Sequence, residues 1–202
     1  MNAETGARIV PANRYLLFFG VAIGGCAFDL ASKSWIFDRL GMPGRNQIWL
    51  WRPIFSLTTS LNEGALFGLG QGLTAVFAAL SVAAAIFIVY WLFFAGAARD
   101  WVLTLTLALI AAGIFGNLYD RLGMHGLRWP GTAERVYAVR DWLYFRIDGV
   151  INWPVFNLAD SLLVCGAVVL FWHVWTMQRS SESGAKPTGN PSEPASAAAA
   201  NE

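Results

Sequence analysis

Charged residues and the side chains of metal or thiol chemistry are scarce in this sequence. Only 13% of the 202 residues are charged, the formal net charge is +1, and there are two histidines and two cysteines. A charge this small gives no sign of a nucleic-acid or acidic partner. Cys26 and Cys165 both fall inside apolar runs without metal-ligand spacing around them. We therefore expect both to be packing residues, and we expect no metal and no cofactor.

Apolar side chains, by contrast, are abundant. They make up 56% of the chain, which also holds ten tryptophans, more than one small soluble core could hide. A helix of about 20 apolar residues crosses a bilayer core of about 30 Å. Four runs are suitable, at residues 15–40, 73–97, 101–118 and 156–177. The sequence predicts an all-α integral membrane protein with four transmembrane helices.

The two ends of the chain differ from this membrane domain, which we place at residues 15–177. Residues 1–14 form a short polar segment. Residues 178–202 are rich in Ser, Ala, Pro and Gly and have almost nothing to bury, which predicts a disordered low-complexity tail.

The unusual polar residues gather on one side of the predicted membrane. With four spans, the end of the first, the start of the second, the end of the third and the start of the fourth face one compartment. The stretches concerned are Asp29 to Lys33, LNEGALFG (61–68), GNLYDR (116–121), RDWLYF (140–145) and FNLAD (156–160). The other side has only the turn at 95–100 and the polar termini.

Structural explanations exist for each of these clusters. Asp29 and Lys33 are four residues apart on one helix face, where an internal ion pair explains them as well as a functional role does. Asn and Asp at helix ends are often caps, so Asp160 could cap the fourth helix. Several such residues on one side nevertheless favour a shared polar site, because uncompensated carboxylates near hydrocarbon are costly.

The common hydrolase motifs are missing. There is no G-x-S-x-G and no H-E-x-x-H. His125 and His173 fall on opposite sides of the membrane, which argues against a Ser-His-acid triad. Ser32 and Ser34 are direct neighbours of Lys33 and point elsewhere on a helix, so a Ser-Lys dyad is disfavoured. Two close aspartates remain as a means of hydrolysis. They would share one proton, so that one takes a proton from water and the other donates to a carbonyl.

Taken in order, the polar motifs resemble those of the prolipoprotein signal peptidases, also called signal peptidase II. The resemblance covers roughly residues 15–177. It rests on D-x-x-x-K at 29–33, N-x-G-x-A/L-F at 62–67, G-N-x-x-D-R at 116–121, D-[FWM] at 141–142 and F-N-x-A-D at 156–160.

This resemblance implies a membrane aspartyl endopeptidase of the bacterial inner membrane, with its active site toward the periplasm. Such enzymes remove the signal peptide of diacylglyceryl-modified prolipoproteins by cutting before the lipidated cysteine. The implied partners are these signal peptides and membrane lipids. We expect no nucleic acid and a monomeric protein.

The resemblance also assigns the site residues. The catalytic pair corresponds to Asp141 and Asp160. An insert longer than the family's separates Arg121 from Asp141, so Asp120 is the second choice for the first carboxylate. Asp141 is preferred because WLYF follows it and its spacing to Asp160 is typical of the family. The supporting residues are Asp29, Lys33, Asn62, Gly64, Asn117, Asp120, Arg121, Asn157 and Ala159.

Two further regions, residues 41–59 and 122–138, each allow two interpretations. Residues 41–59 alternate apolar and aromatic side chains, which predicts a small interfacial β element between helices 1 and 2 that grips lipid and substrate. An ordinary aromatic belt would explain the same pattern. The insert at 122–138 could be a lid over the site, although an inert loop is the simpler expectation.

The sequence leaves open an alternative membrane orientation and two alternative functions. The motif side carries eight arginines against five basic residues on the other side. The positive-inside rule would thus place the motif side in the cytoplasm, opposite to what the resemblance implies. A four-helix transporter or channel that uses buried acids is the rival function, and a structural membrane partner is a third possibility.

Overall fold

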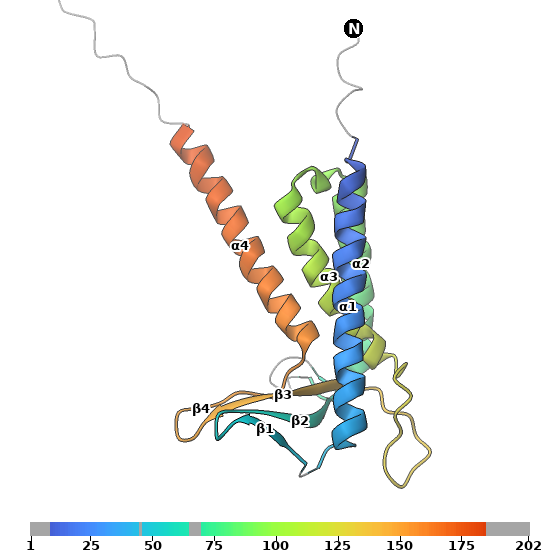
Figure 1. Ribbon diagram of the computed structural model, residues 1–202. Helices are drawn as coiled ribbons and strands as arrows, with labels where there is room; N and C mark the ends of the chain where they lie inside the picture. Colours follow the sequence, from blue (N-terminus) through green and yellow to red (C-terminus); the bar gives the residue numbers. More distant parts are fainter. Residues whose placement is uncertain (1–8, 45, 65–69, 185–202) are drawn as a thin grey trace, which may run out of the picture.

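The chain folds into four long helices and one small sheet (Figure 1). The structure, a computed structural model, describes residues 9–44, 46–64 and 70–184. The helices are α1 (Ala12–Leu40), α2 (Thr74–Val89, continued by the π-helical turn Tyr90–Phe94), α3 (Trp101–Arg121) and α4 (Leu158–Gly184). All four are long and apolar enough to cross a membrane, which confirms the four predicted spans.

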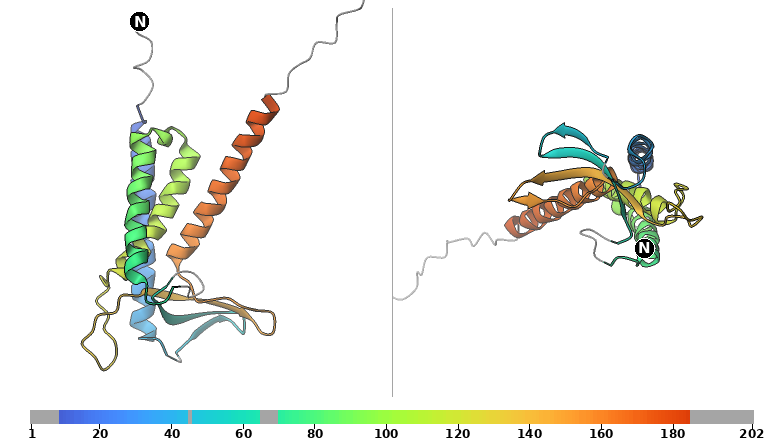
Figure 2. Two further views of the ribbon diagram at one scale, coloured as in Figure 1. Left: turned by 180° about the vertical axis from the view of Figure 1, so that it is seen from behind. Right: turned by 90° about the horizontal axis from the view of Figure 1, so that it is seen from below.

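Three of the helices pack side by side, while the fourth leans away. Helices α1, α2 and α3 run together, and α4 starts next to the lower end of α3 and diverges toward its other end (Figures 1 and 2). The amino-terminal end of α1 and the carboxyl end of α4 lie at the same end of the molecule. Every helix end predicted to carry polar motifs is therefore at the end that holds the sheet.

Helix α4 continues further than the sequence predicted. It ends at Gly184 rather than near residue 177. A helix that is already formed gains one backbone hydrogen bond for each residue it adds, so it extends readily into a polar stretch. Ser180 Oγ, for example, donates to the carbonyl oxygen of Thr176 at 3.0 Å. The rest of the tail predicted to be disordered, 185–202, lies outside the described residues.

The sheet has four antiparallel strands in the order β1-β2-β3-β4. Strands β1 (Ile48–Trp51) and β2 (Phe55–Asn62) lie between α1 and α2, where the sequence predicted a β element. Strands β3 (Val139–Ile147) and β4 (Ile151–Asn152) lie between α3 and α4 and were not predicted. The sequence placed Asp141 only on the polar-motif side of the membrane; in the structure it lies on β3, paired with Ser60 of β2.

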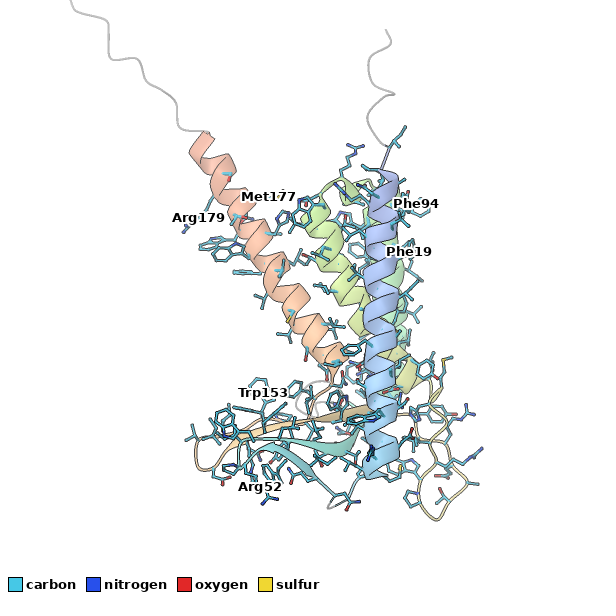
Figure 3. All side chains as sticks on the ribbon, viewed as in Figure 1. Phe19, Arg52, Phe94, Trp153, Met177 and Arg179 are labelled. Atoms are coloured by element: carbon cyan, nitrogen blue, oxygen red, sulfur yellow. The ribbon has the colours of Figure 1, made fainter. Side chains whose placement is uncertain are left out.

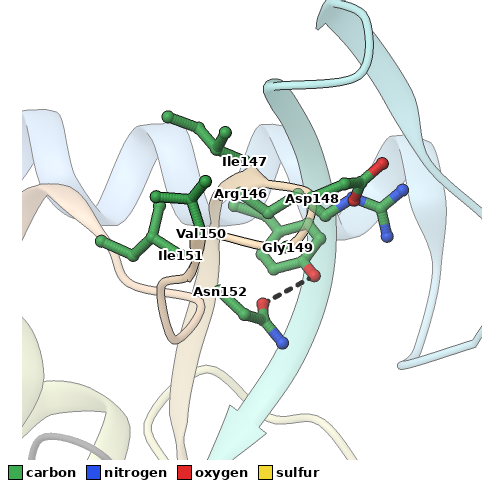
Figure 4. A pocket seen from close by; sticks show the side chains of 8 residues that line it. Arg146, Ile147, Asp148, Gly149, Val150, Ile151 and Asn152 are labelled. Carbon is green, nitrogen blue, oxygen red and sulfur yellow. Dashed lines mark hydrogen bonds and ion pairs between the residues drawn. The ribbon is translucent and has the colours of Figure 1, made fainter.

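The sheet projects sideways at the lower end of the bundle, under α4 (Figures 1 and 2). Arg52 and Trp153 lie on it, whereas Arg179 lies at the far end of α4 (Figure 3). A cavity of about 320 Å³ lies at the turn between β3 and β4. There the Tyr144 hydroxyl donates to Asn152 Oδ1 at 2.9 Å (Figure 4). The predicted site aspartates, Asp29, Asp120, Asp141 and Asp160, do not line this cavity, so it is not the candidate site.

Glycines allow close contact where the helices meet. A Cβ atom on Gly113 of α3 would lie 2.4 Å from the carbonyl oxygen of Ala159, and one on Gly116 would lie 2.4 Å from Asp29 Oδ2. No side chain fits at either distance. These two positions let the start of α4 and the Asp29 side chain approach the backbone of α3.

The cysteines only partly match the sequence interpretation. Cys26 is half-buried, but Cys165 is exposed on α4, so the prediction that it packs inside the protein is wrong. Helix α4 leans away from the other three helices (Figure 1), so few of its side chains are buried. In the described parts of the chain, no group of three His, Cys, Asp or Glu side chains could hold a metal ion.

Candidate active site

The sequence-predicted site residues lie in one connected network at the sheet end of the helices. They come from the second half of α1, the end of β2, the end of α3, strand β3 and the first turn of α4. The fold thus brings together residues that are up to 131 positions apart, from Asp29 to Asp160. Ala65 and Phe67 of the predicted motif lie outside the described residues.

Asn157 donates hydrogen bonds to two carboxylates. Asp141 is 2% exposed on β3, and Asp160 lies in the first turn of α4. The Asn157 amide donates to Asp141 Oδ1 at 2.6 Å, and its backbone N–H donates to Asp160 Oδ2 at 3.2 Å. One residue therefore holds both acids, each by a single oxygen.

Asp160 also caps its own helix. Its backbone N–H donates to Asn157 Oδ1 at 2.9 Å, while its carboxylate accepts from the Asn157 backbone. This reciprocal arrangement is that of a capping box. The capping interpretation is thus correct, but it is incomplete, because Asp160 Oδ1 accepts a further hydrogen bond from Asn117 Nδ2 of α3 at 2.8 Å.

Hydrogen bonds from neighbouring residues fix the orientation of the Asn117 side-chain amide. Its Oδ1 accepts from Lys33 Nζ at 2.9 Å and from Asn157 Nδ2 at 3.2 Å. Because a lysine ammonium can only donate, the Asn117 oxygen must face it. The Asn117 amide nitrogen is then left to donate to Asp160.

Beneath these groups lies a balanced set of buried charges. Lys33 Nζ is 2.7 Å from Asp29 Oδ2 and 3.3 Å from Asp120 Oδ2, and all three side chains are completely buried. Asp120 also accepts from the Arg140 guanidinium and the Arg140 backbone N–H, each at 2.9 Å. Two acids thus face two bases, as buried ions require.

The same ion cluster fixes the start of α4. Asp29 Oδ1 accepts from the backbone N–H of Ala159 at 2.9 Å. This N–H belongs to the first turn of α4, where backbone donors have no partner within the helix. Asp29 thereby links α1 directly to the turn that carries Asp160.

Burial and charge set the protonation of Asp141. Burial, and after it the negative charge of Asp160, raise the pKa of the Asp141 carboxyl to about 8, while donors on Asn157 and Asn62 act in the opposite direction. Asp141 consequently holds a proton at neutral pH. The pair can accept one proton and donate another, which acid-base catalysis requires.

Arg121 joins the end of α3 to the loop after β2. Its Nη2 donates to the carbonyl oxygen of Gly64 at 3.1 Å. Its guanidinium lies 5.5 Å from the ring centre of Phe77. The positive charge is close enough to both Asp141 and Asp160 to interact with them electrostatically.

An apolar cavity of about 340 Å³ opens beside Asp160. It lies between the end of the sheet and α4, and Trp153, Phe156, Ser161, Val164 and Cys165 line it together with Asp160. A carboxylate at the edge of an apolar cavity suits a substrate whose reacting bond is next to a hydrocarbon group.

Comparisons with known proteins agree with this geometry. The family model for signal peptidase (SPase) II matches residues 21–176. The chain belongs to the signal peptidase II family. It is therefore a membrane-embedded protease of the lipoprotein-processing kind, with four helices able to cross the bilayer.

Individual relatives are similar over most of their length. The lipoprotein signal peptidase of Rhodopirellula baltica is 51% identical over 171 residues, which cover 83% of this chain and 75% of the relative. That of Burkholderia mallei is 38% identical over 177 residues, which cover 85% and 92%. These identities confirm the resemblance seen in the motifs.

Solved structures share the fold of this signal peptidase II member. A bacterial membrane enzyme solved by the in meso method at 2.3 Å has a TM-score of 0.67 at 22% identity, covering 90% of this chain and 97% of that one. Another, at 1.9 Å, has a TM-score of 0.63 at 23% identity and covers 83% and 95%. The likeness supports the arrangement of helices and sheet.

Sequence reasoning missed Arg140. This residue is 4% exposed and makes the strongest contacts of Asp120. Its only signal in the sequence is its place directly before Asp141. Its partner is 20 residues away on another element, so no helical spacing reveals the pair.

Proposed function

We propose that the chain is an aspartyl endopeptidase that removes signal peptides from diacylglyceryl-modified prolipoproteins by cutting before the lipidated cysteine. The observation that carries this proposal is that Asn157 donates hydrogen bonds to both Asp141 and Asp160. Membership of the signal peptidase II family supports the substrate class. We also propose that the protein acts as a monomer.

In this mechanism the two carboxyls have different tasks. The Asp160 carboxylate takes a proton from a water molecule, whose oxygen attacks the scissile carbonyl carbon. The Asp141 carboxyl gives its proton to the carbonyl oxygen, and a neutral tetrahedral intermediate forms. Asp160 then gives its proton to the cysteine nitrogen, and the C–N bond breaks. At the same time one hydroxyl of the intermediate returns a proton to Asp141, which leaves the carboxylic acid of the signal peptide and the free amine of the cysteine. No covalent bond to the protein forms.

The neighbours of the pair support this division. Asn117 donates to Asp160 Oδ1 at 2.8 Å, which fixes the orientation of this carboxylate. Lys33 fixes Asn117 from behind. Arg121, near both acids, is placed to hold a substrate carbonyl in an extended conformation. A helical signal peptide satisfies its own amides, so the bond must be cut where the chain unwinds at the membrane boundary.

The diacylglyceryl group would occupy the apolar cavity beside Asp160. This cavity lies on the side of the carboxylate that faces α4 and the lipid. Placement of the lipid there would bring the modified cysteine to the pair. We infer that the protein lies in the bacterial inner membrane with this face toward the periplasm, where lipoproteins mature.

Ion transport is a weaker explanation of the same acids. A conduction path needs polar groups on both sides of the membrane midplane. In the described ranges, the buried charged side chains are Asp29, Lys33, Asp120, Arg140 and Asp141. All belong to the network at the sheet end of the molecule, so none continues a path toward the opposite end.

Complementation in living cells tests the proposal. In bacteria depleted of their own lipoprotein signal peptidase, expression of this chain should convert accumulated diacylglyceryl-modified precursor to the mature form. An unmodified precursor should stay uncut. A cysteine introduced at Met124, in a variant lacking Cys26 and Cys165, should react with a membrane-impermeant thiol reagent from the periplasm. Persistent precursor, or labelling from the cytoplasm alone, would contradict the proposal.

The pH dependence of cleavage follows from the raised pKa of Asp141. Above about pH 8 this carboxyl loses the proton that it must donate. We expect kcat/KM to fall about tenfold per pH unit above that value. Initial rates between pH 4 and 10 would show this, with unfolding temperature measured at each pH. A rate that keeps rising above pH 9 would be inconsistent with this role of Asp141.

A further inference from the structure

The insert between α3 and β3 is an ordered hairpin. Arg128 and Arg135 form a β-bridge, and Trp129 N–H donates to the carbonyl oxygen of Glu134 at 3.0 Å. Val136 is completely buried and its N–H donates to the carbonyl oxygen of Leu127, also at 3.0 Å. The hairpin is therefore packed against the protein.

Three residues of this hairpin line a cavity of about 620 Å³, namely Trp129, Arg135 and Tyr137. The opposite wall is the first turn and a half of α2 and the end of α3, including Ala78, Arg121 and Leu122. Two guanidinium groups and one carboxylate, that of Glu63, share the lining. The cavity is thus positively charged overall and lies at the membrane boundary of α2 and α3.

An apolar cavity of about 490 Å³ continues along the same two helices. Its first residues, Val82 and Leu118, are each four positions deeper than Ala78 and Leu122, which is one helical turn. Val82 and Ile86 are exposed on the outer surface of the bundle. A molecule could therefore enter this groove sideways from the bilayer.

We propose that the hairpin and the α2–α3 face form a binding site for a membrane glycerophospholipid. The phosphate lies beside Arg135, and one acyl chain follows the apolar groove. Arginine binds phosphate through paired hydrogen bonds, and Trp and Tyr favour the level of the lipid head groups. The cavity's net charge of +1, from two arginines and one glutamate, matches the single negative charge of a phosphodiester.

This lipid differs from the lipid part of the proposed substrate. A diacylglyceryl group carries no phosphate, so it offers no negative charge that Arg135 could bind. The groove also lies on the α2 side of α3, whereas the cavity beside Asp160 is lined by α4 and the sheet end. The charged cavity shares Arg121 with the candidate active site, but phospholipid binding is measured without cleavage, so the proposal does not rest on the proposed function.

Native mass spectrometry of the delipidated full-length protein tests the site. The probes are a glycerophospholipid, a diacylglycerol with the same acyl chains, inorganic phosphate and an acidic peptide. We expect the phospholipid to bind more tightly than the other three. Arg135→Gln should weaken that binding by about tenfold or more. Arg128→Gln is the matched control, since Arg128 is exposed on the same hairpin, donates to the Ala133 carbonyl and does not line the cavity.

A second variant keeps the test independent of the hairpin's stability. Val82→Trp places a bulky ring on an exposed position of the groove, so it should fold normally and still lower phospholipid affinity. Equal binding by the Arg135→Gln and Arg128→Gln proteins would overturn the proposal. So would equal binding of phospholipid and diacylglycerol, or preferential binding of phosphate alone or of the acidic peptide.

Discussion

Replacing either Asp141 or Asp160 with Asn is expected to lower cleavage of a diacylglyceryl-modified prolipoprotein by about 10³-fold or more. Asn keeps the shape of the side chain but can neither take a proton from water nor give one to a carbonyl. Asn at position 141 keeps an oxygen that can accept from Asn157 Nδ2. Asn at position 160 keeps one acceptor oxygen in place of the two that bind Asn117 Nδ2 and the Asn157 backbone N–H, so its unfolding temperature is measured beside its rate. The measurement is the single-turnover rate of each purified variant with one precursor.

Stability measurements separate this loss of chemistry from loss of fold. The Asp141 pKa is raised from 3.8 to about 8, so the folded state keeps a proton that the unfolded chain releases. The stability this acid provides is fully present below pH 3.8 and is lost as the pH rises toward 8. At pH 7, Asp141→Asn should therefore unfold at the same temperature as the wild type or higher.

Two further aspartates provide controls. Asp148→Asn changes a 67% exposed side chain that pairs with half-buried Arg146, and we expect an unchanged rate. Asp120→Asn should mainly lower the unfolding temperature, because Asp120 is bound by Lys33 and Arg140. Full activity in Asp141→Asn, together with loss in Asp120→Asn at normal stability, would mean that the insert was placed wrongly and that Asp120 is the first carboxylate.

Removal of the buried lysine should have the largest effect on stability. Lys33→Met leaves Asp29 without a cation and takes one of two cations from Asp120. Loss of one partner from a buried ion pair typically costs about 3–5 kcal/mol. We expect that decrease in the free energy of unfolding in detergent micelles, measured by denaturant titration.

The double variant Asp29→Asn/Lys33→Met tests the cause. Asn at position 29 carries no charge and can still accept from Ala159 N–H, as Asp29 does. Much of the lost stability should return, because the uncompensated charge is gone. If the double variant is no more stable than Lys33→Met, the loss comes from packing of the lysine stem and the charge argument is wrong.

The sequence predicted the parts of this structure that depend on local patterns. Length and apolar content located four helices, and the four-residue spacing of Asp29 and Lys33 predicted a contact that is 2.7 Å long. The place of Asp160 at the start of the fourth span likewise predicted that it could cap that helix. Helical periodicity fixes such neighbours without knowledge of the rest of the fold.

The parts that were missed depend on contacts between distant segments. Strand β3 forms because β2, about 80 residues earlier, offers its backbone groups, as in the pair Ser60 and Asp141. Its residues alternate poorly, since the first four are all buried. Arg140 lies on this strand, so its pairing with Asp120 could not be predicted before the strand itself was known.

The central claim is tested most directly by mass spectrometry of the products that purified wild-type protein releases from a diacylglyceryl-modified prolipoprotein. The account predicts two products, a free signal peptide and a mature chain whose first residue is the lipidated cysteine. Precursor left intact by folded protein, or a cut at any other bond, would contradict it.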